Sequence, residues 1–337
     1  MDLNIGSQRL STYLERHIAG FRAPLSLEKF SDGQSNPTYL ISASSGKYVL
    51  RSKPPGKLLK SAHAIEREYR VMRALAETEV PVPTTLHLCE DESVIGSAFF
   101  VMSYEDGRIF WDPALPDLSN LERTQIYDEM NRVLSNLHRL DINKAELSDY
   151  GRPGNYYSRQ INRWTQQYRS TETKTIEKMD YLIDWLPANV PADDGRISLI
   201  HGDFRLDNMI FHPTDNRIVA LLDWELSTLG HPYADLAYQC MQWRLSNTDE
   251  IKGLRECDRT ALGIPTEEEY VEAYCRRVCI PEIENWHFYL AFSCFRFAAI
   301  VQGVLFRALS GNASSLRARK VGELTGPLTN IAVDLIP

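Results

Sequence analysis

The chain has 337 residues, and 37 lysines and arginines against 45 aspartates and glutamates leave a formal net charge of −8. A mildly acidic chain is a poor candidate for a nucleic-acid-binding protein, because such proteins need a strongly basic surface. Hydrophobic residues make up 43% of the sequence, which predicts a globular protein with a substantial core, and the length suggests two lobes.

The sequence does not predict a membrane protein. Residues 1–20 lack the basic segment and apolar core of a secretory signal. The most apolar stretch, residues 291–309, is interrupted by Arg296, Gln302 and Arg307, and a charge near the middle of a membrane helix is costly. We therefore expect a buried C-terminal helix. The six cysteines form no CxxC pattern, so we expect buried free thiols in a cytoplasmic protein.

The first third of the chain predicts a small sheet and one helix. Residues 27–53 contain three β-like segments separated by two glycine-bearing turns. Apolar residues then recur on one helical face over residues 60–78, and the VPVP sequence at 80–83 ends the helix. Two further strands are predicted at residues 86–91 and 97–107.

After about residue 105 the pattern becomes mainly helical. A single β-like island interrupts the helices at residues 197–225. Together with the β-rich first third, this predicts an α+β fold with two lobes. The long amphipathic patterns cover residues 120–139, 155–187, 266–279 and 284–309.

The most informative segment, residues 199–225, reads LIHGDFRLDNMIFHPTDNRIVALLDWE. A short apolar strand leads into His-Gly-Asp, where Gly202 permits a tight turn, and a hairpin around HPTDN ends near Asp223. We expect Asp203, Asn208 and Asp223 to reach one rim of a site. Carboxylate and amide oxygens suit Mg²⁺, and a carboxylate that the metal does not need can orient a hydroxyl group and accept its proton.

HGDFRLDN followed by DWE resembles the kinase pattern in which HRDxxxxN precedes DFG. In its HGDxxxxN form it resembles the aminoglycoside phosphotransferase and choline kinase family of the protein-kinase-like superfamily. The resemblance implies that Asp203 is the catalytic base and that Asn208 and Asp223 hold Mg²⁺. It places Arg205 where a charge could stabilise the transition state, although a solvent-facing arginine is an equally simple interpretation.

The resemblance also implies a protein-kinase-like division into lobes. Residues 1–103 would form a small β-rich lobe that binds ATP, and residues 104–337 a larger, mainly helical lobe for catalysis and acceptor binding. The hinge would lie at about residues 102–106. Asp235 would brace the catalytic loop, or else be an ordinary acidic residue at the start of a helix.

Positions in the first lobe then acquire implied roles in nucleotide binding. The turn DGQSNPT stands where the phosphate-covering loop lies, with Ser35 and Asn36 as donors. Arg51 replaces the lysine that reaches the phosphates, and Lys53 shares its strand face and is an alternative. Glu68 would pair with this cation. Glu66 is the alternative, but residues two apart on a helix do not share a face.

The same resemblance outlines an adenine pocket. Val49 would cover the base, and Met102 would lie at the back of the pocket. The backbone around Ser103 and Tyr104 would meet the edge of the base.

The segments LSTLGHPYADLAY, KPPGKLLKSAHAIEREYR and LSDYG are similar to the kinase-like domain fused to some acyl-CoA dehydrogenases. This implies an ATP- and Mg²⁺-dependent phosphotransferase with a small-molecule hydroxyl acceptor such as a hydroxyacyl-CoA, and no nucleic-acid or membrane partner. Residues 155–190 are rich in aromatic and basic side chains. They predict either a pocket for an anionic, partly apolar acceptor or a core stripe with a solvated basic flank. An aminoglycoside-modifying enzyme and an inactive nucleotide-binding protein are the alternatives.

Overall fold

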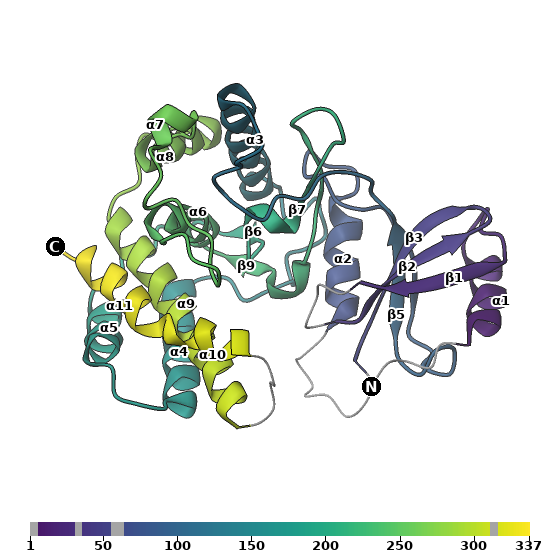
Figure 1. The fold of residues 1–337 in the computed structure, drawn as a ribbon, viewed down its shortest axis with the longest axis horizontal. Helices are drawn as coiled ribbons and strands as arrows, with labels where there is room; N and C mark the ends of the chain where they lie inside the picture. The colour runs from purple at the N-terminus through teal and green to yellow at the C-terminus, as the bar shows by residue number, and fades with distance from the viewer. Residues whose placement is uncertain (1–5, 31–35, 55–63, 311–315) are drawn as a thin grey trace. The chain divides into compact units, whose positions relative to one another are not determined.

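The computed structural model describes residues 6–30, 36–54, 64–310 and 316–337. The chain divides into two compact units, one built around a β-sheet and one mainly helical (Figure 1). The first unit comprises Met1–Arg108, Asn143–Leu147 and Asn208–Ser227, and the second comprises Ile109–Ile142, Ser148–Asp207 and Thr228–Pro337. The mixed α+β fold that we predicted is confirmed, whereas the lobe boundary at residue 103 stays a prediction.

The first unit contains an antiparallel sheet with the strand order β1-β2-β3-β5-β4. The sequence pattern predicted all five strands. The strands are β1 (Leu25–Lys29), β2 (Thr38–Ala43), β3 (Gly46–Ser52), β4 (Thr85–Cys89) and β5 (Phe99–Ser103).

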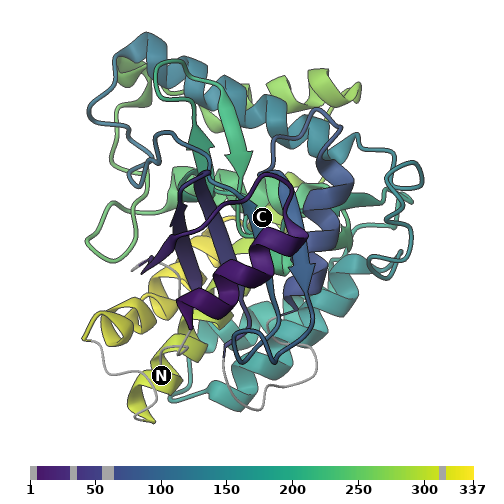
Figure 2. The same cartoon turned by 90° about the vertical axis from the view of Figure 1, so that its right-hand side faces the viewer.

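Two helices cover opposite faces of this sheet (Figures 1 and 2). Because side chains alternate along a strand, Leu50 and its neighbour Val101 share one face, where they join a cluster with Leu10 and Leu14 of α1 (Ser7–His17). The other face meets α2 (Ile65–Leu75), whose bounds lie inside the predicted helix. The sequence analysis did not predict α1.

The second unit is organised around α9 (Trp286–Leu309), which packs most extensively against four other helices. In the described chain it is the helix that is long and apolar enough to cross a membrane, but 78% of its apolar window is buried inside the protein. The expected buried C-terminal helix is therefore confirmed. Its neighbours are α4 (Tyr156–Thr171), α6 (Tyr233–Cys240), α10 (Leu316–Glu323) and α11 (Thr325–Asp334).

The remaining helices of the second unit flank this centre. Of these, α3 and α8 pack against each other and match two predicted amphipathic segments. They are α3 (Asn120–His138), α5 (Glu177–Ala188), the short α7 (Arg259–Leu262) and α8 (Glu267–Val278), with a 3₁₀ turn, η3 (Met241–Arg244).

The pattern at residues 155–187 was expected as one amphipathic segment, but it forms two helices, α4 and α5. The break between the two helices lies at the sequence TETKT, which has three threonines within five residues. Threonine is a poor helix former. Gln302 of α9 donates a hydrogen bond from Nε2 to the carbonyl oxygen of Thr171 at 2.7 Å. One polar interruption of the apolar helix therefore holds the end of α4.

The β-like island forms two small antiparallel pairs rather than one unit. A hairpin joins β7 (Met209–Phe211) to β8 (Ile218–Leu221), as predicted. The strand β6 (Ser198–Ile200) pairs instead with β9 (Thr228–Gly230), which lies beyond the predicted end of the island at residue 225.

Cysteine burial follows the expectation only in part. Cys89, Cys240, Cys275 and Cys294 are buried free thiols, whereas Cys257 is half-buried. Cys279 is exposed because it ends α8 as its C-cap, in a left-handed conformation. Most of these thiols thus serve as small apolar side chains.

We predict that Leu14→Ala destabilises the first unit by about 2–5 kcal/mol, because the leucine is fully buried against the sheet and its loss leaves a cavity. The measurement is the free energy of unfolding in urea. Leu121→Ala is the matched control: Leu121 is exposed on α3, so this change should alter stability by less than about 0.5 kcal/mol. Equal effects of the two substitutions would contradict the packing of α1.

Candidate active site

The β7–β8 hairpin brings two predicted metal ligands together in the first unit. Met209 pairs with Leu221, and the Leu222 amide donates to the Asn208 carbonyl oxygen at 2.8 Å. Asn208, which ends the 3₁₀ turn η1 (Leu206–Asn208), and Asp223, just after the second strand, therefore lie at the same end of the hairpin. Asp223 has φ 65°, a left-handed conformation that aspartate tolerates better than most residues.

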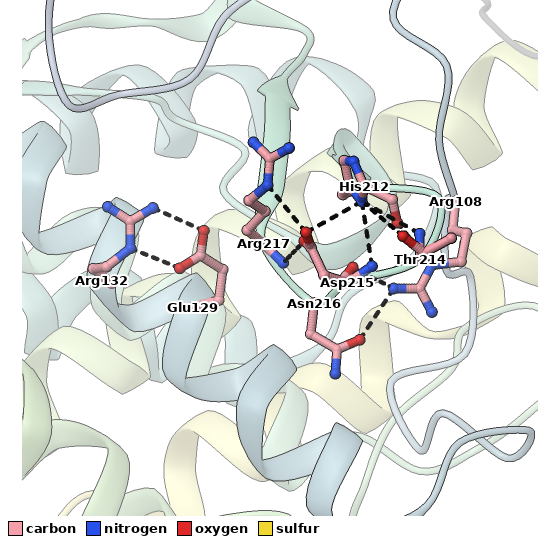
Figure 3. Close-up of polar contacts among 8 residues, drawn as sticks. All are labelled: Arg108, Glu129, Arg132, His212, Thr214, Asp215, Asn216 and Arg217. Carbon is pink, nitrogen blue, oxygen red and sulfur yellow. Dashed lines mark hydrogen bonds and ion pairs between the residues drawn. The ribbon is translucent and has the colours of Figure 1, made fainter.

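The opposite end of the hairpin is fixed by a polar network (Figure 3). His212 Nδ1 accepts hydrogen bonds from the amides of Thr214 and Asp215, each at 3.3 Å. Arg108 donates to the His212 carbonyl at 3.0 Å and to Asn216 Oδ1 at 3.0 Å. These contacts set the turn and so fix the register that places Asn208 beside Asp223.

A second feature of the first unit is an arginine held by three carboxylates. Arg51 Nε lies 2.9 Å from Glu68 Oε2, and Arg51 Nη2 lies 2.7 Å from Asp223 Oδ1. Glu225, in the 3₁₀ turn η2 (Trp224–Leu226), is more distant at 3.9 Å. The predicted partnership of Arg51 with Glu68 is present, and the hairpin aspartate joins it.

Glu68 is the most deeply buried member of this carboxylate cluster, with an exposed fraction of 2%. Its second oxygen, Oε1, accepts a hydrogen bond from Asn36 Nδ2 at 2.8 Å. Burial raises the pKa of Glu68 from 4.5 to about 7, because desolvation and the nearby charges of Asp223 and Glu225 outweigh Arg51 and Asn36. Burial tends to lower the pKa of Arg51, but its carboxylate neighbours raise it overall, so the guanidinium stays charged.

Lys53, the alternative to Arg51 as the phosphate-binding cation, pairs with a different glutamate. Lys53 Nζ forms an ion pair with Glu66 Oε1, and both side chains are partly exposed. Lys53 is therefore bound outside the cluster that holds Arg51. A partly exposed pair of this kind contributes at most about 1 kcal/mol to stability.

The residues predicted to enclose adenine meet across two strands. Val49 of β3 pairs with Met102 of β5, so both lie on the sheet face that also carries Arg51. The Ser103 amide donates to Thr84 O at 2.9 Å, so this N–H already has a partner in the sheet. The Tyr104 ring lies beneath Lys47 Nζ, 5.2 Å from the ring centroid. Of the phosphate-loop donors, Ser35 lies outside the described residues, and Asn36 contacts Glu68.

The predicted catalytic turn lies in the second unit, directly after β6. Gly202 has φ 85°, which is the left-handed conformation that the tight turn requires. The amides of His201 and Gly202 donate to Asp235 Oδ2 and Oδ1 at 2.6 and 2.8 Å. Asp235 therefore braces the loop and is more than an acidic residue at the start of a helix. His138 Nε2 lies 3.3 Å from Asp235 Oδ2.

The carboxylate of Asp235 is fully buried and multiply bound. Desolvation acts to raise its pKa, but hydrogen bonds and the nearby His138 and His201 rings lower it below the ordinary value of 3.8. The group is therefore ionised at neutral pH and holds two backbone amides at once.

Asp203 follows this turn and is partly exposed. Its amide donates to His201 Nδ1 at 3.2 Å, so His201 holds the loop. Arg205 Nε lies 3.4 Å from Asp203 Oδ2, and Arg205 Nη2 lies 2.7 Å from Asp207 Oδ2. Arg205 thus contacts the predicted base and a second carboxylate, while its side chain stays partly exposed.

Three residues that contact this loop were not assigned to it from the sequence. His138 lies behind Asp235, Tyr238 lies near the Asp203 side chain, whose charge raises the pKa of the tyrosine, and Arg296 Nη2 donates to the Gly202 carbonyl at 2.5 Å. Of these three, only Arg296 could have been recognised from the sequence, because a charge inside an otherwise apolar helix needs a polar partner.

The donor set on the hairpin suits a small divalent cation. Asn208 and Asp223 provide an amide oxygen and a carboxylate at adjacent positions, and Mg²⁺ prefers few protein oxygens together with phosphate and water. No group of three His, Cys, Asp or Glu that could hold a metal occurs in the described part of the chain.

The aromatic residues of α4 belong to the core. Tyr156, Tyr157, Trp164 and Tyr168 are buried, while Arg163 and Arg169 are exposed. This matches the core stripe with a solvated basic flank. Tyr156 and Tyr157 also line a small pocket with His231 and Tyr289, so the alternative of an acceptor pocket stays a prediction.

Comparison with known proteins gives consistent matches over most of the chain. A family model described as "Phosphotransferase enzyme family" matches residues 26–289. Acyl-CoA dehydrogenase family member 10 of Mus musculus is 50% identical over 327 residues, which cover 95% of this chain and 30% of that protein. The chain spans less than half the length of the curated relatives that it matches.

Solved structures extend the likeness to the fold. A crystal structure described as a "putative aminoglycoside phosphotransferase" from Ralstonia eutropha is 48% identical, with a TM-score of 0.90 over 97% of both chains. An aminoglycoside phosphotransferase in ternary complex with ADP and hygromycin B is 15% identical, with a TM-score of 0.61 over 96% of this chain and 97% of the other. The second likeness concerns the fold alone.

The raised pKa of Glu68 predicts a specific pH dependence of stability. Between pH 4.5 and about 7 the folded state binds more protons at Glu68 than the unfolded state does. Protonation of Glu68 therefore stabilises the folded state fully at low pH, and this stabilisation is lost as the pH rises through 7. Relative to Glu68→Gln, the wild type should lose roughly 2–3 kcal/mol across this range. The measurement is urea unfolding of both proteins at pH 5, 6, 7 and 8. Parallel stability curves would show that Glu68 does not titrate there.

Proposed function

Because this chain belongs to the phosphotransferase enzyme family, we propose that it transfers the γ-phosphate of ATP to a hydroxyl group of a small molecule in the presence of Mg²⁺. The observation that carries the proposal is the cluster of Arg51 with Glu68 and Asp223. A neighbour of similar fold was solved with ADP, which supports a nucleotide as the phosphate donor.

The first unit would bind the nucleotide. Arg51 would contact the phosphates, because a guanidinium stays charged and can bind phosphate oxygens through two N–H groups. Glu68 would hold its Nε, which leaves other donors of the planar group for the ligand. Val49 and Met102 would enclose adenine, since they are neighbours on the same sheet face.

Asn208 and Asp223 would hold the metal. When bound, Mg²⁺ would neutralise negative charge on the phosphate oxygens. Asp223 already contacts Arg51, so its carboxylate would be shared between the cation of the protein and the ion. The left-handed backbone at Asp223 fixes the direction in which this side chain leaves the hairpin.

Asp203 would act as the catalytic base. Its carboxylate would accept a hydrogen bond from the acceptor hydroxyl, orient the oxygen for attack and take the proton as the phosphoryl group transfers. Arg205 lies next to Asp203 and Asp207. During transfer it would leave one of these carboxylates, contact the phosphoryl group and stabilise the negative charge of that group.

The acceptor that we propose is a hydroxyacyl-CoA. Support comes from the 50% identity to a protein named as an acyl-CoA dehydrogenase family member, because a kinase domain joined to such an enzyme would act on a related compound. The description of the 48% identical structure favours an aminoglycoside as the second candidate. A screen of ATP consumption with hydroxyacyl-CoAs, aminoglycosides, choline and sugars separates these acceptors, and no Mg²⁺-dependent consumption with any acceptor would contradict the proposed function.

We predict that Asp203→Asn lowers kcat by roughly 10²–10⁴-fold, because the amide cannot accept the proton of the hydroxyl. The dissociation constant of a non-hydrolysable ATP analogue should change by less than about threefold, since nucleotide contacts lie elsewhere in the proposal. Steady-state kinetics and calorimetric titration measure the two effects. Asp117→Asn, at an exposed loop position, is the control and should leave kcat unchanged. Wild-type turnover by the Asp203→Asn protein would remove the proposed base.

A further inference from the structure

The turn at residues 201–203 is held from two helices of the second unit. Asp235 of α6 binds the amides of His201 and Gly202. Two further residues, Tyr238 and Arg296, contact the same turn and have no part in the proposed chemistry. Arg296 binds the Gly202 carbonyl, and Tyr238 lies near the Asp203 side chain, so both α6 and α9 reach the turn beside the predicted base.

Tyr238 lies three residues after Asp235 on α6, so both side chains project from one face of the helix. Its ring is buried, with an exposed fraction of 7%, and its hydroxyl lies close enough to the Asp203 carboxylate for that charge to act on it. Burial raises the pKa of Tyr238, and the Asp203 charge raises it further. The hydroxyl therefore stays protonated and remains a donor at neutral pH.

Arg296 is a buried cation in an apolar helix, with an exposed fraction of 6%. Its guanidinium carbon lies 5.6 Å from the ring centroid of Trp164 and 5.3 Å from that of Tyr238, within the range of cation–π interactions. In the described chain it forms no ion pair with a carboxylate. Burying a guanidinium without a counter-charge costs several kcal/mol, which an apolar residue at this position would avoid.

The contacts of Arg296 explain why a cation is useful there. One nitrogen, Nη2, donates to the Gly202 carbonyl at 2.5 Å, while the guanidinium lies over the Tyr238 ring. A single side chain thus contacts both the peptide before Asp203 and the tyrosine ring near Asp203. Lysine could supply the charge and one hydrogen bond, but it could not supply the planar group.

We infer that Tyr238 and Arg296 are positioning residues for Asp203. Tyr238 occupies one acceptor site of the carboxylate and fixes its rotamer, which leaves the remaining acceptor sites directed at the hydroxyl of the substrate. Arg296 holds Tyr238 and the Gly202 carbonyl in place. The inference rests on the proposed function, because it assigns Asp203 the role of base.

The first test is Tyr238→Phe, which removes only the hydroxyl. We expect kcat with Mg·ATP and a hydroxyacyl-CoA to fall about 10- to 100-fold, because a misplaced catalytic group is costly, while KM for ATP stays within twofold. Tyr270→Phe is the matched control: Tyr270 is buried, and its hydroxyl has no hydrogen-bond partner in the described chain. Unchanged kcat in Tyr238→Phe, or an equal fall in both variants, would overturn the role of Tyr238.

The second test compares Arg296→Met with Arg296→Lys by hydrogen–deuterium exchange of the peptide that covers residues 199–208. We expect faster exchange in the methionine variant and partial return to the wild-type rate in the lysine variant, with kcat following the same order. Equal exchange rates in the wild type and both variants would show that Arg296 does not hold the loop. Absence of turnover in the wild type would refute the proposed function instead, and the exchange rates would still decide whether Arg296 holds the loop.

Discussion

The buried carboxylate of Glu68 determines much of the first unit. An ionised side chain without solvent is costly unless charge and hydrogen bonds compensate for it, and here Arg51 and Asn36 contact one oxygen each. Arg51 in turn needs the carboxylates of Asp223 and Glu225. Strand β3, helix α2 and the end of the β7–β8 hairpin are therefore joined through one guanidinium, and no member of the cluster can change its charge independently.

The second unit uses buried charge for a related purpose. Asp235 holds two amides of the catalytic turn, and Arg296 holds a carbonyl of the same turn. Neither residue is needed to fill the core, and both would be replaced by apolar side chains if packing alone mattered. Burying these two charges is costly, and both lie where the backbone must be rigid, next to the residue that we propose as the base.

Local patterns predicted the parts of this protein that depend on neighbours in sequence. Alternation along β3 placed Val49 and Arg51 on one face, and the hairpin around HPTDN placed Asp223 near the end of its second strand. These two inferences rest on the period of strands and on turn patterns, which are local. Glu68 was assigned from the resemblance to kinases, and the structure pairs Arg51 with Glu68.

Features that depend on distant contacts were not predictable in this way. Helix α1 lies against the sheet through Leu10 and Leu14, and the separation of α4 from α5 is stabilised by Gln302 of α9. The partners of Arg296 and Tyr238 come from segments far apart in the chain. A single sequence shows that Arg296 needs a polar partner, but it does not show which carbonyl accepts its hydrogen bond.

Calorimetric titration of a non-hydrolysable ATP analogue, with and without Mg²⁺, tests most directly whether the cation on β3 binds the nucleotide. Arg51→Met is compared with Lys53→Met, because Lys53 follows on the same strand face but pairs with Glu66. The account predicts Mg²⁺-dependent binding that Arg51→Met weakens at least about tenfold, or 1.4 kcal/mol, and that Lys53→Met leaves within about threefold of the wild type. Wild-type affinity of the Arg51→Met protein, or an affinity that is the same with and without Mg²⁺, would contradict this account.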